Sequence, residues 1–241
     1  MSNTSDDASE LATAEPVDTR VVAVRSVFKT YATAAGQLDV LDGVSFDVEG
    51  RRLHVLAGAA GSGITTVLGL IACLDRPDAG QVWVAGADVA TATRAARREL
   101  RRTSIGIVHP RPAANVLPGL PAGGNIAWAA KLRTGAVLNA SGIEAHLDQV
   151  GLAGAARARV GDLSDGEQQR LALACALAGE PRLVVADEPT VALGRDEGTR
   201  FVNAVRDAAD RGVCVLVGSS DPLVLEAADT LTRLAHGRVV T

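Results

Sequence analysis

The segment GAAGSGITT, residues 58–66, lies between two apolar segments. LHVLA at 53–57 precedes it and has the length and composition of a buried strand. VLGLIACL at 67–74 follows it and has the composition of a buried helix. A strand, a glycine-rich turn and a helix in this order place backbone N–H groups and a helix N-terminus around one point. The stretch therefore predicts a phosphate-binding loop.

The loop matches the pattern G-x-x-x-x-G-K-[ST] at every fixed position except the lysine. Gly58, Gly63 and Thr65 stand at the glycine and hydroxyl positions, and Gly61 adds a further glycine. The lysine position is Ile64, an apolar side chain that cannot donate a hydrogen bond to phosphate. The residues that we expect to surround the phosphates are Gly58, Ala59, Ala60, Gly61, Ser62, Gly63, Ile64, Thr65 and Thr66.

Composition indicates a globular protein whose net negative charge comes from its first 18 residues. Of the 241 residues, 47% are hydrophobic, which is enough for a substantial core. Five of the 28 acidic residues lie in 1–18, so the rest of the chain carries 23 acidic and 24 basic residues. A nearly neutral body gives no reason to expect a nucleic-acid partner. Residues 1–19 lack periodicity, and we expect a disordered acidic tail there.

The sequence also bears on location. No apolar run approaches the ~18 residues that a membrane-spanning helix needs, and the start of the chain does not resemble a signal peptide. We therefore expect a soluble chain that reaches a membrane only through a partner. Cys73, Cys175 and Cys214 stand singly in apolar runs, which favours core packing in a reducing compartment over metal binding. Lys29 is interpreted as an exposed surface residue.

Periodicity and composition predict alternating strands and helices around the loop. The expected strands cover 19–31, 40–48, 53–57, 81–84, 105–108 and the apolar run that begins at 183. The expected helices cover 63–73, 91–102, 125–133, 143–152 and the apolar run 171–179. The helix at 91–102 carries five arginines, which fits a solvated face. Between 109 and 124, four prolines and three glycines predict a segment without regular structure.

A second motif is LVVADEPT at 183–190, an apolar strand that ends in two adjacent carboxylates. In a nucleotide-hydrolysing site such a strand presents one carboxylate to magnesium and the next to the attacking water. Asp187 would then hold Mg²⁺, and Glu188 would orient or deprotonate water as the catalytic residue. Taken alone, an acidic pair at a strand end fits a solvated turn equally well.

A third motif is LSDGEQQR at 163–170, which precedes the apolar helix. Ser164 and Gly166 stand at the mouth of that helix, where free backbone N–H groups attract anions. Ser164 is also well suited to be an ordinary helix N-cap, and the sequence leaves both interpretations open.

These three motifs, in this order and spacing, resemble the nucleotide-binding subunits of ATP-binding cassette (ABC) transporters. The resemblance covers the whole chain after the tail. Within the family, the chain is most similar to the branch that serves lipoprotein release and macrolide export. Four further segments carry it, namely LDRPDAG (74–80), IGIVHP (105–110), LPGLPAGGN (117–125) and LTRLAHGRVV (231–240).

The resemblance implies an α/β fold of the P-loop NTPase type, with an antiparallel β portion and a helical subdomain. It implies one ABC domain over 20–241, with the helical subdomain at about 110–160. Subunits of the family pair, and each nucleotide lies between the phosphate loop of one and the signature helix of the other. ATP and Mg²⁺, a transmembrane permease subunit and a second ATPase subunit are implied as ligands and partners. The implied location is cytoplasmic, peripheral to the inner face of the cell membrane.

The resemblance also assigns roles to residues of this chain. It makes Tyr31 the aromatic side chain that stacks on adenine, and Thr65 with Asp187 the magnesium positions. It makes Glu188 the water-orienting carboxylate. Ser164 and Gly166 become the donors that face the partner's nucleotide.

Five motif positions depart from the family pattern, and together they predict weak ATP binding and impaired hydrolysis. Ile64 replaces the lysine, and Pro110 replaces the glutamine of the following loop. Asp165 replaces the first signature glycine, and Gly194 replaces an aspartate. Ser220 replaces the switch histidine. A lost charge-assisted phosphate contact costs about 1.5–3 kcal/mol, and lost transition-state contacts reduce turnover further.

Three functions remain open at this point. In the first, favoured interpretation, the chain is a degenerate nucleotide-binding subunit of a transport complex. It then pairs with a motif-complete ATPase subunit in preference to a second copy of itself. Alternatively, it is an active ATPase subunit whose altered residues are compensated. In the third case it is a soluble adaptor that keeps the fold without transport.

Overall fold

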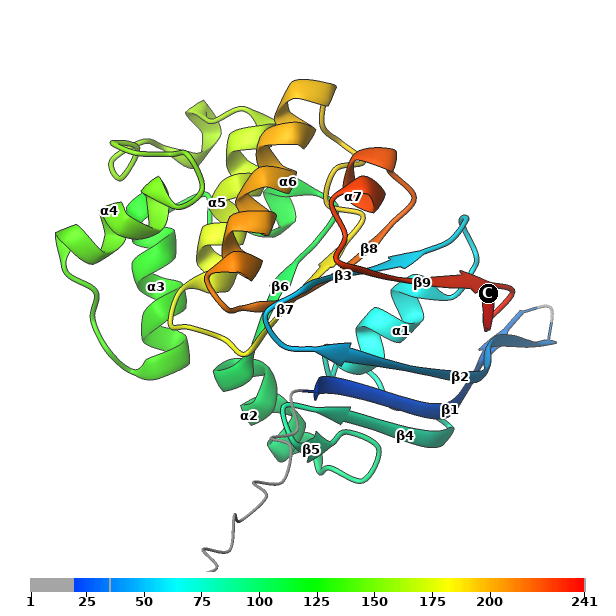
Figure 1. The fold of residues 1–241 in the computed structure, drawn as a ribbon. Coiled ribbons are helices and arrows are strands. Elements are labelled where there is room, and N and C mark those ends of the chain that lie inside the picture. The colour runs from blue at the N-terminus through cyan, green and yellow to red at the C-terminus, as the bar shows by residue number, and fades with distance from the viewer. Residues whose placement is uncertain (1–19, 35, 241) are drawn as a thin grey trace, which may run out of the picture.

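The computed structural model describes residues 20–34 and 36–240 and contains two β-sheets with helices around them (Figure 1). The expected acidic tail lies outside the described residues. The antiparallel sheet has the order β2-β1-β4-β5, formed by Gly36–Glu49, Arg20–Thr33, Ala79–Val84 and Ala87–Asp88. The second sheet has the order β10-β9-β3-β8-β7-β6, formed by Arg238–Val240, Thr230–Ala235, Leu53–Ala57, Cys214–Ser219, Leu183–Asp187 and Ile105–Val108. In this sheet β9, β3, β8, β7 and β6 are parallel, and β10 pairs with β9 in antiparallel fashion.

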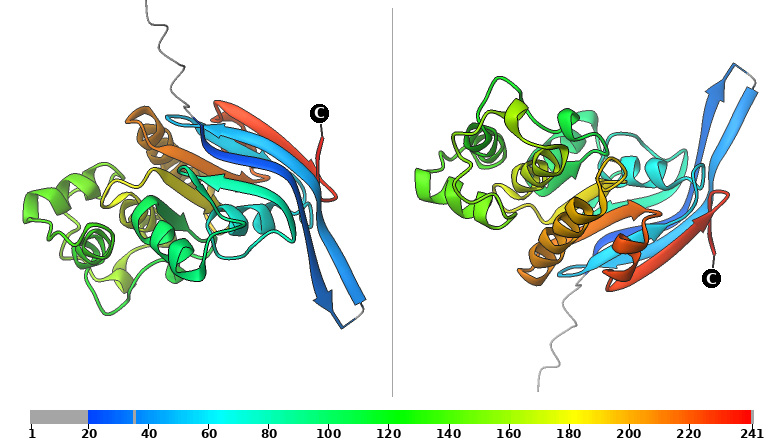
Figure 2. Two further views of the ribbon diagram at one scale, coloured as in Figure 1. Left: turned by 90° about the horizontal axis from the view of Figure 1, so that it is seen from below. Right: turned by 90° about the horizontal axis from the view of Figure 1, so that it is seen from above.

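Helices cover both faces of the parallel sheet. The α-helices are α1 (Ile64–Ile71), α2 (Arg94–Ser104), α3 (Ala122–Thr134), α4 (Ala140–Asp148), α5 (Asp165–Leu177), α6 (Arg195–Asp210) and α7 (Pro222–Glu226). Single 3₁₀ turns occur at Pro112–Ala114 and Val160–Asp162. α1 lies between the two sheets, and α3 to α6 lie on the opposite face of the parallel sheet (Figure 1). The far end of the β1–β2 hairpin projects beyond the rest of the molecule (Figure 2).

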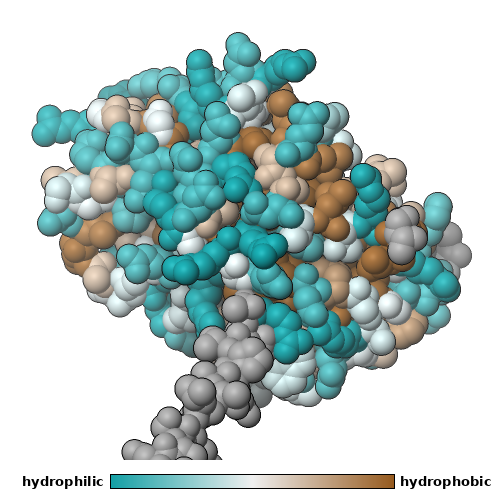
Figure 3. Space-filling view, in the orientation of Figure 1, coloured by the Kyte–Doolittle hydropathy of each residue, from teal (hydrophilic) through white to brown (hydrophobic). Residues whose placement is uncertain are grey.

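The parallel strands send alternate side chains to two hydrophobic core clusters. In β7, Leu183 and Val185 belong to the cluster around α1, whereas Val184 belongs to the cluster around α5 and α6. In β8, Leu216 packs on the α1 side and Val217 on the other. Strands buried on both faces read as continuous apolar runs, which is why LHVLA and LVVA are almost wholly apolar. Outside, the face seen in Figure 3 is mostly hydrophilic, with small, separate hydrophobic groups.

The fold class expected from the family resemblance is confirmed, and several element boundaries move. β3 and β6 have the predicted bounds, and the strand that begins at 183 is β7. The expectation of no regular structure between 109 and 124 is wrong. Two of its four prolines, Pro112 and Pro121, form the N1 position of a 3₁₀ turn and the N-cap of α3, where a missing N–H donor costs nothing.

The arginine-rich helix is less solvated than expected. In α2, Arg97 donates to the carbonyl oxygen of Asp75 at 3.1 Å, and Arg101 donates to that of Cys73. Both carbonyls lie just after α1, where a helix leaves acceptors unsatisfied. The arginines therefore attach α2 to the end of the phosphate-loop helix. The cysteines are free thiols, with Cys73 and Cys214 buried, as expected for core packing.

A partly buried cation helps to attach the helical part to the parallel sheet. Arg133, near the end of α3, donates to the carbonyl oxygens of Ile105, Ala176 and Ala178 at 2.9, 3.1 and 2.8 Å. Buried residues of α3 and α4 share one core cluster with α5 and α6. The proposed separate helical subdomain at about 110–160 therefore stays a prediction.

Candidate functional site

A hollow of about 590 Å³ lies at the carboxyl ends of β3 and β7, over the N-terminus of α1. All of 58–66 lines it, together with Asp187, Glu188 and Ser220. Its remaining lining comes from Leu38, Asp39, Val40 and Val191. Ligands bind at the carboxyl ends of parallel strands in open α/β sheets, so this is the expected position for a phosphate ligand. The structure thus brings the first two motifs together.

Two glycines give the loop its shape. Gly61 and Gly63 have φ angles of 79° and 100°, in the left-handed region that favours glycine. A methyl group at position 63 would also overlap Leu41 and the carbonyl oxygen of Val40. The buried Ser62 accepts at its carbonyl from Gly237 N–H at 3.1 Å, which ties the loop to the turn before β10. The loop is therefore held from both sheets.

Ile64 belongs to the hydrophobic core as well as to the loop. Its side chain is 7% exposed and lies in the cluster around α1. Cγ2 of Ile64 occupies the space where Gly218 of β8 has no side chain, since a methyl group at position 218 would overlap it. Burial of such a side chain stabilises the fold by about 1.5–3 kcal/mol. The position that is usually a cation is here a packing residue.

The residues expected to hold magnesium lie together. Oδ1 of Asp187 is buried and has no hydrogen-bond partner among the described residues, and the Thr65 hydroxyl is close enough to affect the pKa of the same carboxylate. Burial raises the pKa of Asp187, while the Thr65 hydroxyl and the nearby His109 lower it. A buried carboxylate oxygen without a partner, next to a hydroxyl, is a suitable position for a divalent cation. The two residues therefore fit Mg²⁺.

Glu188 is held by two serines at the end of β8. Its Oε2 accepts from the Ser219 hydroxyl at 3.2 Å and its Oε1 from the Ser220 hydroxyl at 3.4 Å. The backbone of Glu188 has a φ of 39° and its N–H donates to the carbonyl oxygen of Gly218 at 2.8 Å. Ser219 was not among the predicted site residues, although the apolar run before it indicates a strand that would end at this serine. The carboxylate therefore faces the hollow in a defined position.

The third motif forms the start of α5. Ser164 is the N-cap: its hydroxyl accepts from Glu167 N–H at 3.3 Å, and the Glu167 carboxylate accepts from Ser164 N–H at 2.9 Å. The predicted cap is thus confirmed as a capping box. Glu197 of α6 was not among the predicted site residues, and its carboxylate lies against Gly166 and pairs with Arg170. This helix mouth is more acidic than expected.

Comparison with known proteins agrees with this geometry. The family model described as ABC transporter matches residues 41–191. The lipoprotein-releasing system ATP-binding protein LolD of Anaeromyxobacter dehalogenans is 37% identical over 94% of this chain and 95% of its own length. The macrolide export ATP-binding/permease protein MacB of Escherichia coli K12 is 30% identical over 92% of this chain.

The chain belongs to the ABC transporter family. It spans only 34% of the length of MacB. A dimeric post-hydrolysis structure of the ATP-binding cassette MJ0796, bound to ADP and Pi, superimposes with a TM-score of 0.80 at 27% identity. It covers 91% of this chain and 97% of the cassette. The fold is therefore that of an ABC cassette.

Other ABC motif positions lie outside the hollow. Ser164, Gly166 and Tyr31 do not line it. The Tyr31 hydroxyl donates to Asp75 Oδ2 at 2.8 Å, and its ring lies beside the Lys29 ammonium, whose nitrogen is 5.1 Å from the ring centre. Stacking of Tyr31 on adenine, and contact of the α5 mouth with a partner's nucleotide, therefore stay predictions.

The interpretation of Lys29 as an exposed residue is wrong. Its side chain is 8% exposed, and Nζ donates to the carbonyl oxygen of Arg76 at 2.8 Å. The ammonium also pairs with Asp75 and Asp78, each at 3.2 Å. Burial lowers the pKa of Lys29, but these partners outweigh it and leave the pKa raised. Lys29 is therefore a charged structural residue behind α1 and does not line the hollow.

The loop after β6 is held by hydrogen bonds within the loop and to α5. His109 N–H donates to Asn115 Oδ1 at 2.7 Å, and Nε2 of the fully buried Gln169 donates to the His109 carbonyl oxygen at 2.9 Å. Asn115 Nδ2 also donates to Gln169 Oε1 at 3.2 Å. Pro110 lies inside this loop and adds neither an amide side chain nor a backbone donor. The loop is thereby fixed to the helix that carries the third motif.

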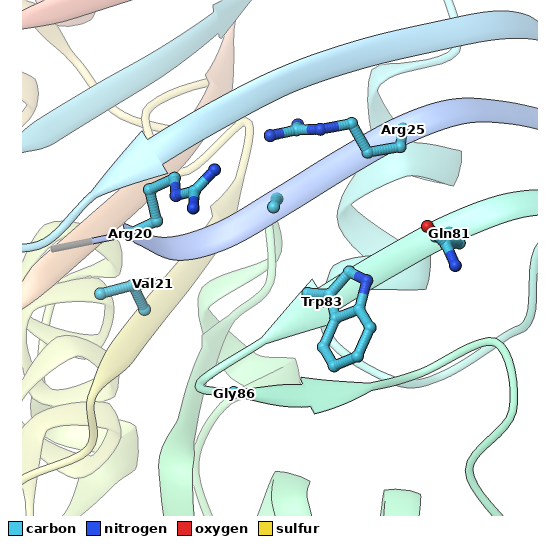
Figure 4. A pocket seen from close by; sticks show the side chains of 7 residues that line it. Arg20, Val21, Arg25, Gln81, Trp83 and Gly86 are labelled. Carbon is cyan, nitrogen blue, oxygen red and sulfur yellow. The ribbon is translucent and has the colours of Figure 1, made fainter. Parts of the chain in front are cut away.

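A second hollow lies on the outer face of the antiparallel sheet (Figure 4). Trp83, Gln81, Arg20 and Arg25 line it. The Arg25 guanidinium is already paired with Asp47 at 2.7 Å. None of the three sequence motifs reaches this hollow, so the phosphate-loop hollow is the candidate site.

Proposed function

We propose that this chain is a nucleotide-binding subunit of an ABC-type membrane transport complex, with weakened ATP binding and impaired hydrolysis. The backbone N–H groups of 58–66 bind the phosphates, and Thr65 with Asp187 hold Mg²⁺. When bound, Mg²⁺ neutralises phosphate charge and supports the transfer of the terminal phosphate to water. Glu188 orients that water.

The observation that carries this proposal is the double role of Ile64. The hollow keeps the shape and hydroxyls of the loop and the two carboxylates at and just after the end of β7, but the side chain at the lysine position packs against Gly218 in the core. Backbone donors and the helix N-terminus still favour phosphate. A cation that would stabilise the transition state is missing, and such a loss reduces turnover by about 10²–10³-fold.

One observation favours the alternative of an active ATPase. Ser219 and Ser220 hold both oxygens of Glu188, so the water-orienting carboxylate is positioned without a histidine. A serine cannot carry the positive charge that a histidine brings to the terminal phosphate. We therefore keep the impaired subunit as the proposal and the active subunit as the alternative.

Partners follow from the relatives. LolD is described as part of a lipoprotein-releasing system, and MacB as an export protein with a permease. None of the described helices is long and apolar enough to cross a membrane. We propose that the chain works in the cytoplasm, at the inner face of the membrane, with a transmembrane permease subunit and a second ATPase subunit. The helical part at about 110–160 is its proposed subdomain.

Two measurements test the proposed function. Calorimetry of the purified chain with ATP and magnesium should give a Kd between high micromolar and millimolar, or ~4–6 kcal/mol. Phosphate release should stay at the level of the Glu188→Gln variant. Fast release from the wild type alone would favour the active ATPase. Failure to co-purify with any membrane subunit, together with no nucleotide binding, would favour the soluble adaptor.

A further inference from the structure

The phosphate-loop hollow is lined by acidic side chains without basic ones. Among its described lining residues, Asp39, Asp187 and Glu188 carry carboxylates, and none is Lys, Arg or His. Free ATP adds about four negative charges at neutral pH, and like charges at short range repel strongly in a partly buried site. The helix N-terminus of α1 supplies only about half a positive charge. The site therefore disfavours a bare polyphosphate.

Within residues 20–34 and 36–240, neither Lys29 nor His109 is placed to replace the missing lysine. Ile64 is packed in the core, and the ammonium of Lys29 is held by Asp75, Asp78 and a carbonyl oxygen behind α1. His109 acts on Asp187 from a separate apolar hollow between α1 and β6. Moving Lys29 into the phosphate hollow would break the ion pairs that its ammonium makes with Asp75 and Asp78. The charge must therefore come with the ligand.

We propose that this site binds nucleotide only as its magnesium complex, so that magnesium is required for binding itself as well as for hydrolysis. The inference rests on the proposed function and specifies the form of the ligand. Asp187, with its unpartnered Oδ1, and the Thr65 hydroxyl receive the cation. Magnesium removes about two of the nucleotide's charges and converts the Asp187 carboxylate from a repulsive group into an attractive one.

The test measures nucleotide affinity with and without magnesium. The full chain is titrated with ATP by calorimetry in millimolar MgCl₂ and, separately, in EDTA. We expect binding in magnesium and an affinity about a hundredfold lower in EDTA. Equal affinities in the two buffers would overturn the inference and leave the proposed function standing. Absence of binding in both buffers would overturn the proposed function and this inference with it.

Two variants link the magnesium requirement to the charge of the hollow. Ile64→Lys should bind ATP in EDTA within about tenfold of its affinity in magnesium, because the ammonium supplies the missing charge. Ile64→Val is the matched control, since it changes the same core position without charge, and it should keep the wild-type ratio. If the affinity of Ile64→Lys for ATP were still a hundredfold lower in EDTA than in magnesium, the inference would be contradicted.

A third variant covers the case in which Ile64→Lys fails to fold. Asp39 lies at the rim, where it accepts from the Thr30 hydroxyl at 2.7 Å, a bond that an asparagine oxygen can keep. Asp39→Asn removes one of the three charges and should lower the ratio of the two affinities by about tenfold. An unchanged ratio in this folded variant would overturn the electrostatic explanation.

Discussion

The side chain at position 64 serves the apolar core and the phosphate loop at the same time. A lysine there has to leave the space beside Gly218 and reach into the hollow. The vacated space then costs stability, since loss of a buried isoleucine is typically worth about 2–5 kcal/mol. Restoring the motif and keeping the core are therefore opposing demands at this one residue.

We predict that Ile64→Lys raises ATP affinity and leaves hydrolysis near background. The new ammonium adds a phosphate contact worth about 1.5–3 kcal/mol, or ten- to a hundredfold in Kd. Pro110, Gly194 and Ser220 still leave the water and the terminal phosphate without their usual groups. Calorimetry and a phosphate-release assay on the same preparation check both parts. Fast turnover of the single variant would show that the lysine was the one functional defect.

His54 is a buried residue whose charge state affects stability. It lies in β3, stacks on Phe46, and its ring nitrogens contact the hydroxyls of Thr230 at 2.7 Å and Thr232 at 3.0 Å. Burial lowers its pKa from 6.5 to about 4. Below pH 6.5 His54 becomes protonated in the unfolded chain, whereas in the folded chain it stays neutral down to about pH 4. The stabilisation by neutral His54 is therefore complete above pH 6.5 and decreases as the pH falls toward 4.

We predict that this residue makes the free energy of unfolding fall by up to about 3 kcal/mol between pH 6.5 and 4. Urea unfolding of the wild type and of His54→Gln across this range measures the difference in slope. His236→Asn is the control, because His236 is exposed and has a positive φ that asparagine tolerates. Parallel pH profiles for the wild type and His54→Gln would refute the assignment.

At the level of elements, the parallel sheet and the helices α3 and α5 meet at one guanidinium. Arg133 satisfies three carbonyl oxygens at the end of α5 and the start of β6. Burial lowers its pKa, yet the group stays charged because an arginine is not deprotonated in proteins. The three bonds therefore hold the helices in position on the sheet.

We predict that Arg133→Met destabilises the chain by about 3 kcal/mol, because it leaves these carbonyls without donors. Thermal unfolding followed by circular dichroism measures the loss. Arg94→Met is the matched control, since Arg94 is exposed at the start of α2, and its effect should stay within about 0.5 kcal/mol. Equal melting temperatures for the two variants would show that the buried bonds contribute little.

At the level of the whole molecule, the two halves of the site lie in different parts of the surface. The α5 mouth does not line the phosphate-loop hollow, and we propose that a second subunit brings a signature helix to it. In a pair of identical chains both sites would combine Ile64 with Asp165. With a motif-complete partner, one site would join the partner's intact loop to this chain's Ser164 and Gly166, which keep a helix N-terminus as donor.

We predict that the complex hydrolyses ATP mainly at the partner's phosphate loop. Removing the lysine of that loop in the partner alone should therefore abolish the activity of the reconstituted pair. The charge of Glu197 at the α5 mouth is balanced by Arg170 and Arg200, with which it pairs. The remaining like charge, on Asp165, reduces the activity without preventing it, since one like charge is a limited cost at an effective dielectric near ~20. Persistent activity in that variant would mean that this chain's own loop is competent, and the impaired-subunit proposal would be abandoned.

Features that depend on local pattern can be predicted from residue order. The strand, glycine turn and helix around 58–66, the carboxylates at the end of β7 and the cap at Ser164 all follow from residue order. Each is set by a few neighbouring residues, whose spacing and turn chemistry have a direct geometric meaning. The family resemblance then supplied the arrangement of the two sheets.

The surroundings of each of these residues, by contrast, depend on tertiary contacts. Ile64 is a core residue because β8, more than 150 positions later, places Gly218 against it. Lys29 is buried because the end of α1 brings Asp75 and Asp78 to it. Ser219 holds Glu188 because β7 and β8 are neighbours in the sheet. These contacts depend on strand order and sheet packing, which join distant segments and leave no periodic pattern in the sequence.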